Sequence, residues 1–165
     1  MKNRFGSFVM LTFLAGLVLV SCNSGVMYDA RVDLPETGWY KDEAVKFDLD
    51  ITDTLLPYDF NLNINHTTDY RYANLYLFMI TRFPDGKMSR DTLEVMMAYP
   101  DGEWLGKGWG AFRDREENLR TELFFPRTGV YTFYLQQAMR VDTLKDIRRI
   151  GLQVVLSGEQ VSHNY

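Results

Sequence analysis

From Ala44 onward, apolar and polar residues alternate along much of the chain with a period of two. The apolar positions of the first two alternating segments are Val45, Phe47, Leu49 and Ile51, followed by Phe60, Leu62 and Ile64. Because successive side chains of a strand point to opposite faces of a sheet, this pattern predicts strands with one buried and one solvated face. The run from Leu75 to Ile80 is apolar or aromatic throughout, so it predicts a central strand covered on both faces.

Turn signals separate the later alternating segments. Pro-Asp-Gly occurs at residues 84–86 and again at 100–102, on either side of an alternating segment that ends at Tyr99. Further alternation is found at residues 119–125, 131–135 and 150–156. These segments predict further strands joined by tight turns.

One segment, residues 141–149, departs from the period of two. Leu144, Ile147 and Arg148 have helical spacing there, and Asp142 precedes them as a suitable N-cap, so a short helix is expected. About eight strands and one short helix predict an all-β fold, a single-domain antiparallel β-sandwich of jelly-roll type. A chain of 165 residues suits one domain, and no linker or repeat divides it.

The N-terminal residues have the pattern of a secretory signal peptide. Lys2 and Arg4 precede an apolar run from Phe5 to Val20, which is short for the 30 Å core of a bilayer. The segment Leu19-Val20-Ser21-Cys22 resembles the lipobox of bacterial lipoproteins, which predicts removal of residues 1–21 and lipidation of Cys22. The alternative is an ordinary signal peptide with a chance cysteine beside the cleavage site.

The rest of the composition supports the same organisation. Cys22 is the only cysteine, so it has no disulfide partner within the chain. We therefore expect a signal peptide (1–21), a lipidated N-terminal segment (22–43) and a β-sandwich domain (44–165). No other segment is apolar and long enough to span a bilayer, so the acyl chains are the expected membrane attachment. A net charge of −4 gives no basic surplus for binding nucleic acid, which is excluded as a partner.

Residues that could carry catalysis or bind a metal are few. The two histidines, His66 and His163, are expected at the surface, and neither has a neighbouring ligand at metal-binding spacing. No Gly-x-Ser-x-Gly motif presents a serine nucleophile. Four carboxylates could form an acid/base pair or bind calcium, although solvated positions are their default: Asp48, Asp50, Asp101 and Glu103. We expect no catalytic residue, no metal site and no cofactor.

The segment from Gly102 to Gly110 is rich in glycine and contains two tryptophans. Glycines at this density indicate close approach of the backbone to a neighbouring element rather than a phosphate-binding loop. Trp104 and Trp109, together with Tyr99, could stack on sugar rings as an exposed platform. The alternative, favoured by the aromatic content of 15%, is that these rings fill the core.

The triplet Asp-Thr-Leu occurs three times, with its threonines at Thr54, Thr92 and Thr143. It resembles the acceptor sequence of the general O-glycosylation system of Bacteroidetes, in which the threonine hydroxyl carries the glycan. The alternative is that Asp-Thr simply begins strands and helices. The sequence does not decide between these two interpretations.

Two longer segments of the chain are distinctive: Tyr70-Arg71-Tyr72-Ala73-Asn74-Leu75 and Gly102-Glu103-Trp104-Leu105-Gly106-Lys107-Gly108. They are the most specific parts of a likeness that runs from about residue 44 to 156, over which the chain resembles the GldH family, the gliding-motility lipoproteins of Bacteroidetes. The resemblance implies an accessory lipoprotein of the gliding apparatus and the linked type IX secretion system. Only Cys22 acquires a defined chemical role from it.

The function expected from the sequence is that of a non-enzymatic lipoprotein that binds other envelope proteins of the gliding and secretion apparatus. Residues 23–25 lack the acidic run of a surface-export signal, so we expect an outer-membrane location facing the periplasm. The alternative is a carbohydrate- or peptidoglycan-binding β-sandwich. An enzyme such as a glycoside-processing sandwich would require two carboxylates in a cleft, which a sequence does not display.

Overall fold

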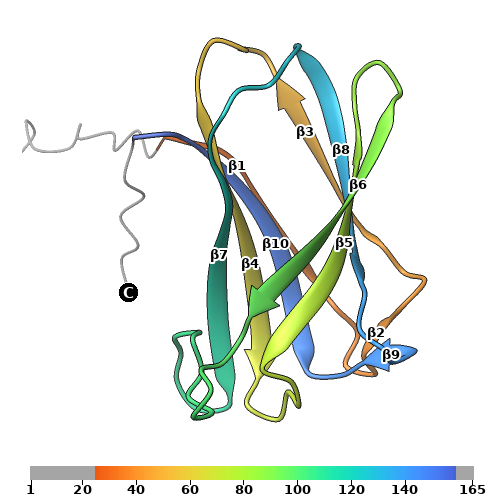
Figure 1. The fold of residues 1–165 in the computed structure, drawn as a ribbon, viewed down its shortest axis with the longest axis vertical. Coiled ribbons are helices and arrows are strands. Elements are labelled where there is room, and N and C mark those ends of the chain that lie inside the picture. The colour runs from red at the N-terminus through yellow and green to blue at the C-terminus, as the bar shows by residue number, and fades with distance from the viewer. Residues whose placement is uncertain (1–24, 159–165) are drawn as a thin grey trace, which may run out of the picture.

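The computed structural model describes residues 25–158, and this range contains ten β-strands (Figure 1). In chain order they are β1 (Val26–Asp33), β2 (Trp39–Tyr40), β3 (Val45–Ile51), β4 (Tyr58–Thr67), β5 (Asn74–Arg82), β6 (Met88–Met96), β7 (Phe112–Leu123), β8 (Gly129–Gln137), β9 (Thr143–Leu144) and β10 (Ile147–Leu156). Within the same range there is no helix that could cross a membrane.

The strand order is that of a jelly roll. One four-stranded sheet has the order β1-β10-β4-β7 and the other has the order β3-β8-β5-β6, while β2 and β9 form a small separate sheet. All neighbouring strands are antiparallel. If the eight long strands are numbered along the chain, the two sheets read 1-8-3-6 and 2-7-4-5, which is the jelly-roll arrangement. The predicted fold class is therefore confirmed.

The inner faces of the two large sheets form the hydrophobic core. Every second residue of β3 is buried, from Val45 to Ile51, as the alternation predicts. Leu62 of β4 and Leu77 of β5 have no exposed surface. Truncating a leucine buried in this way typically costs about 2–5 kcal/mol of folding free energy, so these inner faces carry most of the stability.

The sandwich begins at Val26, earlier than the boundary at residue 44 that the sequence suggested. Strand β1 pairs with β10 along its length, and the Gly25 carbonyl accepts a hydrogen bond from the Leu156 amide at 3.0 Å. Gly25 is therefore part of the folded body rather than of a tether. The periodic signal of β1 is weak because its inward residues include the small Ala30, and Val32 is 37% exposed.

The short helix predicted at residues 141–149 is wrong. Thr143 and Leu144 form β9, and β10 begins at Ile147. Leu144 and Ile147 are both buried, but Asp146, with a positive φ of 71°, bends the chain between them. Their three-residue spacing therefore arises because they belong to two different strands on either side of a bend. It resembles helical spacing by coincidence.

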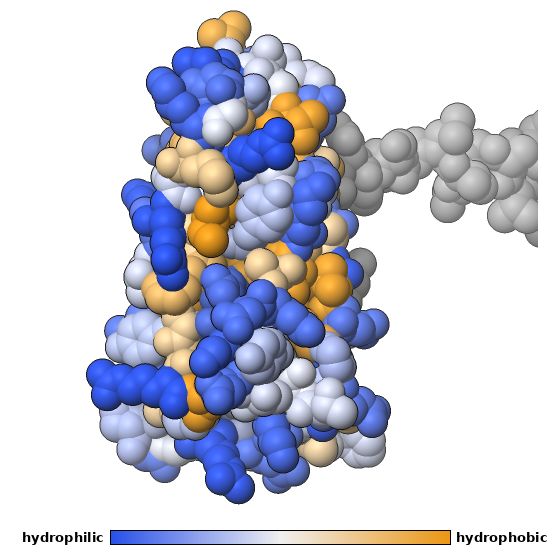
Figure 2. All heavy atoms as spheres, turned by 90° about the vertical axis from the view of Figure 1, so that its right-hand side faces the viewer, coloured by the Kyte–Doolittle hydropathy of each residue, from blue (hydrophilic) through white to orange (hydrophobic). Residues whose placement is uncertain are grey.

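Strand β5 is covered on one face only, which corrects the expectation of a strand buried on both sides. Leu75 and Leu77 face the core, whereas the outward Tyr76 is 37% exposed and Phe78 is half-buried. The Arg90 guanidinium lies 3.8 Å from the centre of the Phe78 ring and shields it by a cation–π contact. Figure 2 views this side of the molecule and shows apolar patches separated by hydrophilic side chains.

Candidate functional site

The glycine-rich segment lies between β6 and β7 and packs along the backbone of β7. The Lys107 amide donates to the Asp114 carbonyl at 2.9 Å, and the Asp114 amide donates back at 2.7 Å. A Cβ atom on Gly106 would lie 3.0 Å from the Asp114 carbonyl oxygen, and one on Gly108 would overlap the Phe112 carbonyl oxygen. The interpretation of these glycines as sites of close backbone approach is confirmed.

The three predicted stacking residues have different environments. Trp104 packs against the core, with its ring edge-on to that of His66 at a centroid distance of 4.7 Å. Trp109 is 95% exposed and Tyr99 is 52% exposed. Trp104 thus follows the alternative that places the rings in the core, whereas Trp109 and Tyr99 remain candidates for contact with a ligand.

His66 is fully buried, contrary to the expectation of a surface residue. Its Nδ1 lies 2.9 Å from the Thr67 carbonyl oxygen, and its Nε2 has no hydrogen-bond partner. Burial lowers the pKa of His66, so the imidazole is neutral, with Nδ1–H donating to Thr67. Inward alternation within β4 would have identified this burial. The other histidine, His163, lies outside the described residues.

The carboxylates noted in the sequence have different structural roles. Hydrogen bonds from Lys46 and Thr132 hold the pKa of Asp48 below its usual value. Asp101 accepts a hydrogen bond from the Glu103 amide at 3.1 Å within the Pro-Asp-Gly turn. Among residues 25–158, no three His, Cys, Asp or Glu residues are grouped so that they could hold a metal ion.

The three candidate glycosylation sites lie in unlike structures. Thr54 is half-buried in the loop between β3 and β4, Thr92 is exposed in the middle of β6, and Thr143 is exposed at the start of β9. Only Thr143 therefore follows the alternative in which Asp-Thr begins an element. Modification of these threonines stays a prediction, as does lipidation of Cys22, which lies outside the described residues.

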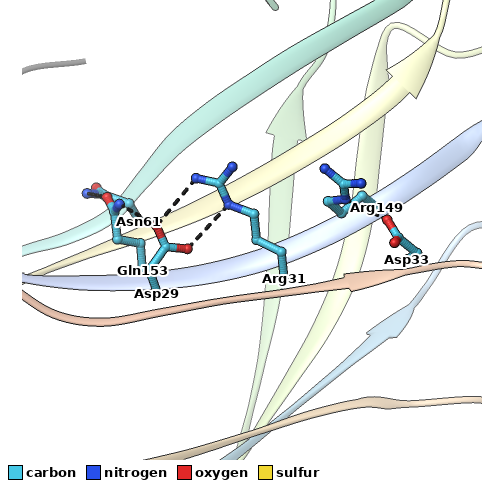
Figure 3. A network of polar contacts seen from close by, with 6 residues as sticks. All are labelled: Asp29, Arg31, Asp33, Asn61, Arg149 and Gln153. Atoms are coloured by element: carbon cyan, nitrogen blue, oxygen red, sulfur yellow. Dashed lines mark hydrogen bonds and ion pairs between the residues drawn. The ribbon is translucent and has the colours of Figure 1, made fainter. Parts of the chain in front are cut away.

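A continuous polar surface covers the outer face of the β1-β10-β4-β7 sheet. One row crosses all four strands: Gln153 donates to Asp29 at 3.0 Å, and Asn118 donates to Asn61 at 2.9 Å. Asn61 makes a longer contact of 3.5 Å with Gln153, which joins the two halves of the row (Figure 3). The residues come from strands far apart in the sequence, so only the sheet register aligns them.

A second polar row crosses the same face four residues further along each strand. Arg149 forms an ion pair with Asp33 at 2.5 Å, visible at the right of Figure 3. Asn65 donates to Asp114 at 2.7 Å. The second row is therefore held in place by direct contacts, as the first is.

Between the two rows, Gly151 leaves a hollow of about 280 Å³. The Arg31 side chain lies across this glycine, since a Cβ at residue 151 would be 2.8 Å from Arg31 Cγ. The next residue in the row is Asn63, whose Nδ2 is buried and has no hydrogen-bond partner. The residues that line the hollow are Arg31, Asn63, Ile64, Asn65, Lys107, Gly108, Asp114, Arg115, Glu116, Arg149 and Gly151.

The chemistry of this polar hollow suits a ligand with several hydroxyl groups. Its arginines are largely compensated, since Arg31 pairs with Asp29, Arg149 with Asp33 and Arg115 with Glu117. Carboxylates and amides on the same walls can accept and donate hydrogen bonds. Compensated charge and mixed hydrogen-bonding groups favour a neutral polar ligand over an anion.

A second hollow, of about 290 Å³, opens between the two sheets near β6 and β7. Its walls are mainly apolar and include Phe60, Phe125 and Phe133 of the core. The exposed side chains of Asp91 and Arg120 lie among its lining residues. The base of this apolar cleft consists of core residues that are themselves almost fully buried.

Comparisons with known proteins point to one family. A family model described as "GldH lipoprotein" matches residues 26–154. A protein of Christiangramia forsetii named "Gliding motility lipoprotein GldH homolog" is 36% identical over 161 residues, covering 93% of this chain and 97% of that protein. A protein of Flavobacterium johnsoniae named "Gliding motility lipoprotein GldH" is 28% identical over 151 residues, covering 87% and 93% respectively.

The buried His66 predicts a pH-dependent stability. Its folded-state pKa lies below the unfolded value of 6.5, so stability that is full above pH 6.5 is lost as the pH falls through the folded-state pKa. The loss is at most about 1.4 kcal/mol per pH unit. His66→Asn keeps a donor for the Thr67 carbonyl but does not titrate. The free energy of unfolding of this variant should therefore change less between pH 6.5 and 5 than that of the unaltered protein. Urea unfolding at each pH measures this, and equal slopes in the two proteins would contradict the assignment.

Proposed function

Because this chain belongs to the GldH lipoprotein family, we propose that it is a lipid-anchored accessory protein of the gliding machinery, without catalytic activity of its own. It acts by binding other envelope proteins of the motility apparatus and of the linked type IX secretion system. The observation that carries the proposal is the match of the family model across nearly all of the described sandwich. The extended polar face and the apolar cleft supply surfaces on which such partners can bind.

The proposed anchor is close to the folded body. Cys22 precedes Gly25 by three residues, a stretch of chain that spans at most about 10 Å. Gly25 is bonded to Leu156, and the Pro57 carbonyl accepts from the Ser157 amide, so the β3–β4 loop lies at the same end of the sandwich. In that loop Leu55 is 84% exposed and Leu56 is 40% exposed. Two exposed leucines beside the anchor suit the end of the molecule that faces the bilayer.

Replacing Cys22 by Ala tests the anchor. The variant has no thiol to carry the lipid, so it should move from the membrane fraction to the soluble fraction of the envelope and take up no labelled fatty acid. Ser21→Ala is the matched control, because it keeps a small residue before the cysteine and should leave the protein in the membrane. A Cys22→Ala protein that still pellets with membranes and incorporates fatty acid would rule out this anchor.

Crosslinking in the native host tests the partner proteins. We expect components of the motility or secretion apparatus to be recovered with the membrane-bound protein and to be depleted with the Cys22→Ala variant, which is no longer held at the same surface. Mass spectrometry of the crosslinked species identifies them. Recovery of none of these components, under conditions that capture other assemblies of the envelope, would count against the proposal.

A second candidate function is binding of a neutral envelope saccharide, favoured by the polar hollow over Gly151. Its walls offer hydroxyl-binding groups, an unpartnered Asn63 amide and, next in sequence to the lining Gly108, the exposed Trp109. Jelly-roll sandwiches also include lectin domains. This reading places the ligand on the sheet face rather than on the three-residue platform expected from the sequence.

Asn63→Leu separates this function from stability. Because Asn63 Nδ2 has no partner in the protein, the substitution should leave the free energy of unfolding unchanged or raise it. It should weaken saccharide binding by about tenfold or more, the effect of removing one good hydrogen bond to a ligand. Calorimetric titration with neutral envelope oligosaccharides measures the affinity. Absence of binding to the unaltered protein, or equal affinity in the variant, would remove this candidate.

A further inference from the structure

Strand β6 is an open edge of the β3-β8-β5-β6 sheet (Figure 1). It pairs with β5 along all nine residues on one side. On its other side, no backbone group between Met88 and Val95 bonds to the main chain of any described residue. At its end, the Met96 carbonyl accepts a hydrogen bond from Arg115 Nε at 2.9 Å. An edge of this length presents a template for another strand.

The hydrogen bonds of the β5–β6 hairpin determine which backbone groups face the open edge. Phe83 N donates to Lys87 O at 2.9 Å at one end, and Met97 N donates to Ala73 O at 2.8 Å at the other. Hydrogen-bonded and non-hydrogen-bonded pairs alternate along an antiparallel ladder, so odd-numbered residues of β6 bond to β5. The residues whose amide and carbonyl groups point to the open edge are Met88, Arg90, Thr92, Glu94 and Met96.

The side chains of these five residues all lie on the outer face of the sheet, which Figure 2 views. Met88 is 62% exposed and Met96 is 45% exposed, and Thr92 between them is also exposed. Arg90 is held over the Phe78 ring, and Glu94 accepts a hydrogen bond from Asn74 Nδ2 at 2.7 Å. Both charged side chains of the edge therefore contact residues of the neighbouring strand β5.

We propose that this edge is a self-association surface, on which β6 of a second copy of the chain pairs antiparallel about a two-fold axis through Thr92. The outer-face sequence Met-Arg-Thr-Glu-Met is complementary to itself in that orientation. Arg90 of each copy lies opposite Glu94 of the other, and Met88 lies opposite Met96. Directly opposed charges of this kind stabilise a strand pair, and the two exposed methionines become buried against each other.

Only one register gives this match. A shift of the axis by one residue in either direction places Arg90 opposite an uncharged side chain, and a shift by two places Arg90 against Arg90 or Glu94 against Glu94. Charged side chains usually protect an edge against pairing. Here they disfavour every register except the one in which Arg90 lies opposite Glu94. Asp91 lies on the opposite face of the sheet, at the apolar cleft, and takes no part in the charge pairs. The inference does not depend on the gliding role.

Two charge reversals test the pairing. Arg90→Glu places Glu opposite Glu twice in a homodimer, and Glu94→Arg places Arg opposite Arg twice, so each variant alone should dimerise about tenfold or more weakly than the unaltered chain. An equimolar mixture restores two opposite-charge pairs and should return to the dimer. Sedimentation velocity of the full chain in detergent, with one variant carrying a mass tag, measures all three samples. Lys46→Glu, an exposed cation on the outer face of the far edge strand β3, is the matched control and should leave the dimer unchanged.

Three results would overturn the proposal: an unaltered chain that sediments as a monomer throughout the concentration range, variants that dimerise as well as the unaltered chain, or a mixture that stays monomeric. Circular dichroism checks that each variant folds. If one reversal fails to fold, Thr92→Arg replaces it, because this exposed residue would place two arginines together on the axis. Undiminished dimerisation of folded Thr92→Arg would likewise overturn the proposal.

Discussion

The burial of two sheet faces against each other is the interaction on which the other features of this protein depend. Successive side chains of a strand point to opposite faces, so the residues that must enter the core also determine which residues face solvent. Leu62 enters the core, and its neighbours Asn61 and Asn63 are thereby placed on the outer face of the same sheet. A slip of one residue would bury those amides and expose the leucine. The register required by the core thus positions the polar rows and the hollow between them.

The outer surfaces follow from a few departures from regular packing. Gly151 removes one side chain from the centre of a polar face, and a hollow results where the neighbouring rows are closed by direct contacts. Gly106 and Gly108 let the segment before β7 lie directly on that strand, while Trp104 fastens the same segment to the core through His66. The polar hollow is therefore bounded on one side by the sheet and on the other by a loop that contacts both β7 and the core.

These surfaces relate to the proposed role in different ways. In the proposed role Cys22 carries the lipid, which places one end of the sandwich at the membrane and leaves the remaining faces open to the envelope. The polar face of the β1-β10-β4-β7 sheet offers hydrogen-bonding groups with compensated charge, whereas the opposite sheet offers apolar patches and an unpaired strand edge. The two sheets can thus contact different molecules at the same time, which suits an accessory component of a larger assembly.

The sequence by itself determined the features that depend on neighbouring residues: the alternating strands, the Pro-Asp-Gly turns, the jelly-roll class and the close approach of the Gly106 and Gly108 backbone. The sequence pattern suggested a helix at residues 141–149 because Leu144 and Ile147, which belong to different strands, happen to have helical spacing. The same pattern missed β1 because Ala30 gives little hydrophobic signal. The alternation of β4 already places His66 on the inner face, but only the tertiary structure decided that Trp104 packs against it. It also decided which residues meet across strands, because Asp29, Gln153, Asn61 and Asn118 are aligned by sheet register and not by any local pattern. Local periodicity records which face a side chain occupies, whereas its neighbours on that face are set by how the strands pair.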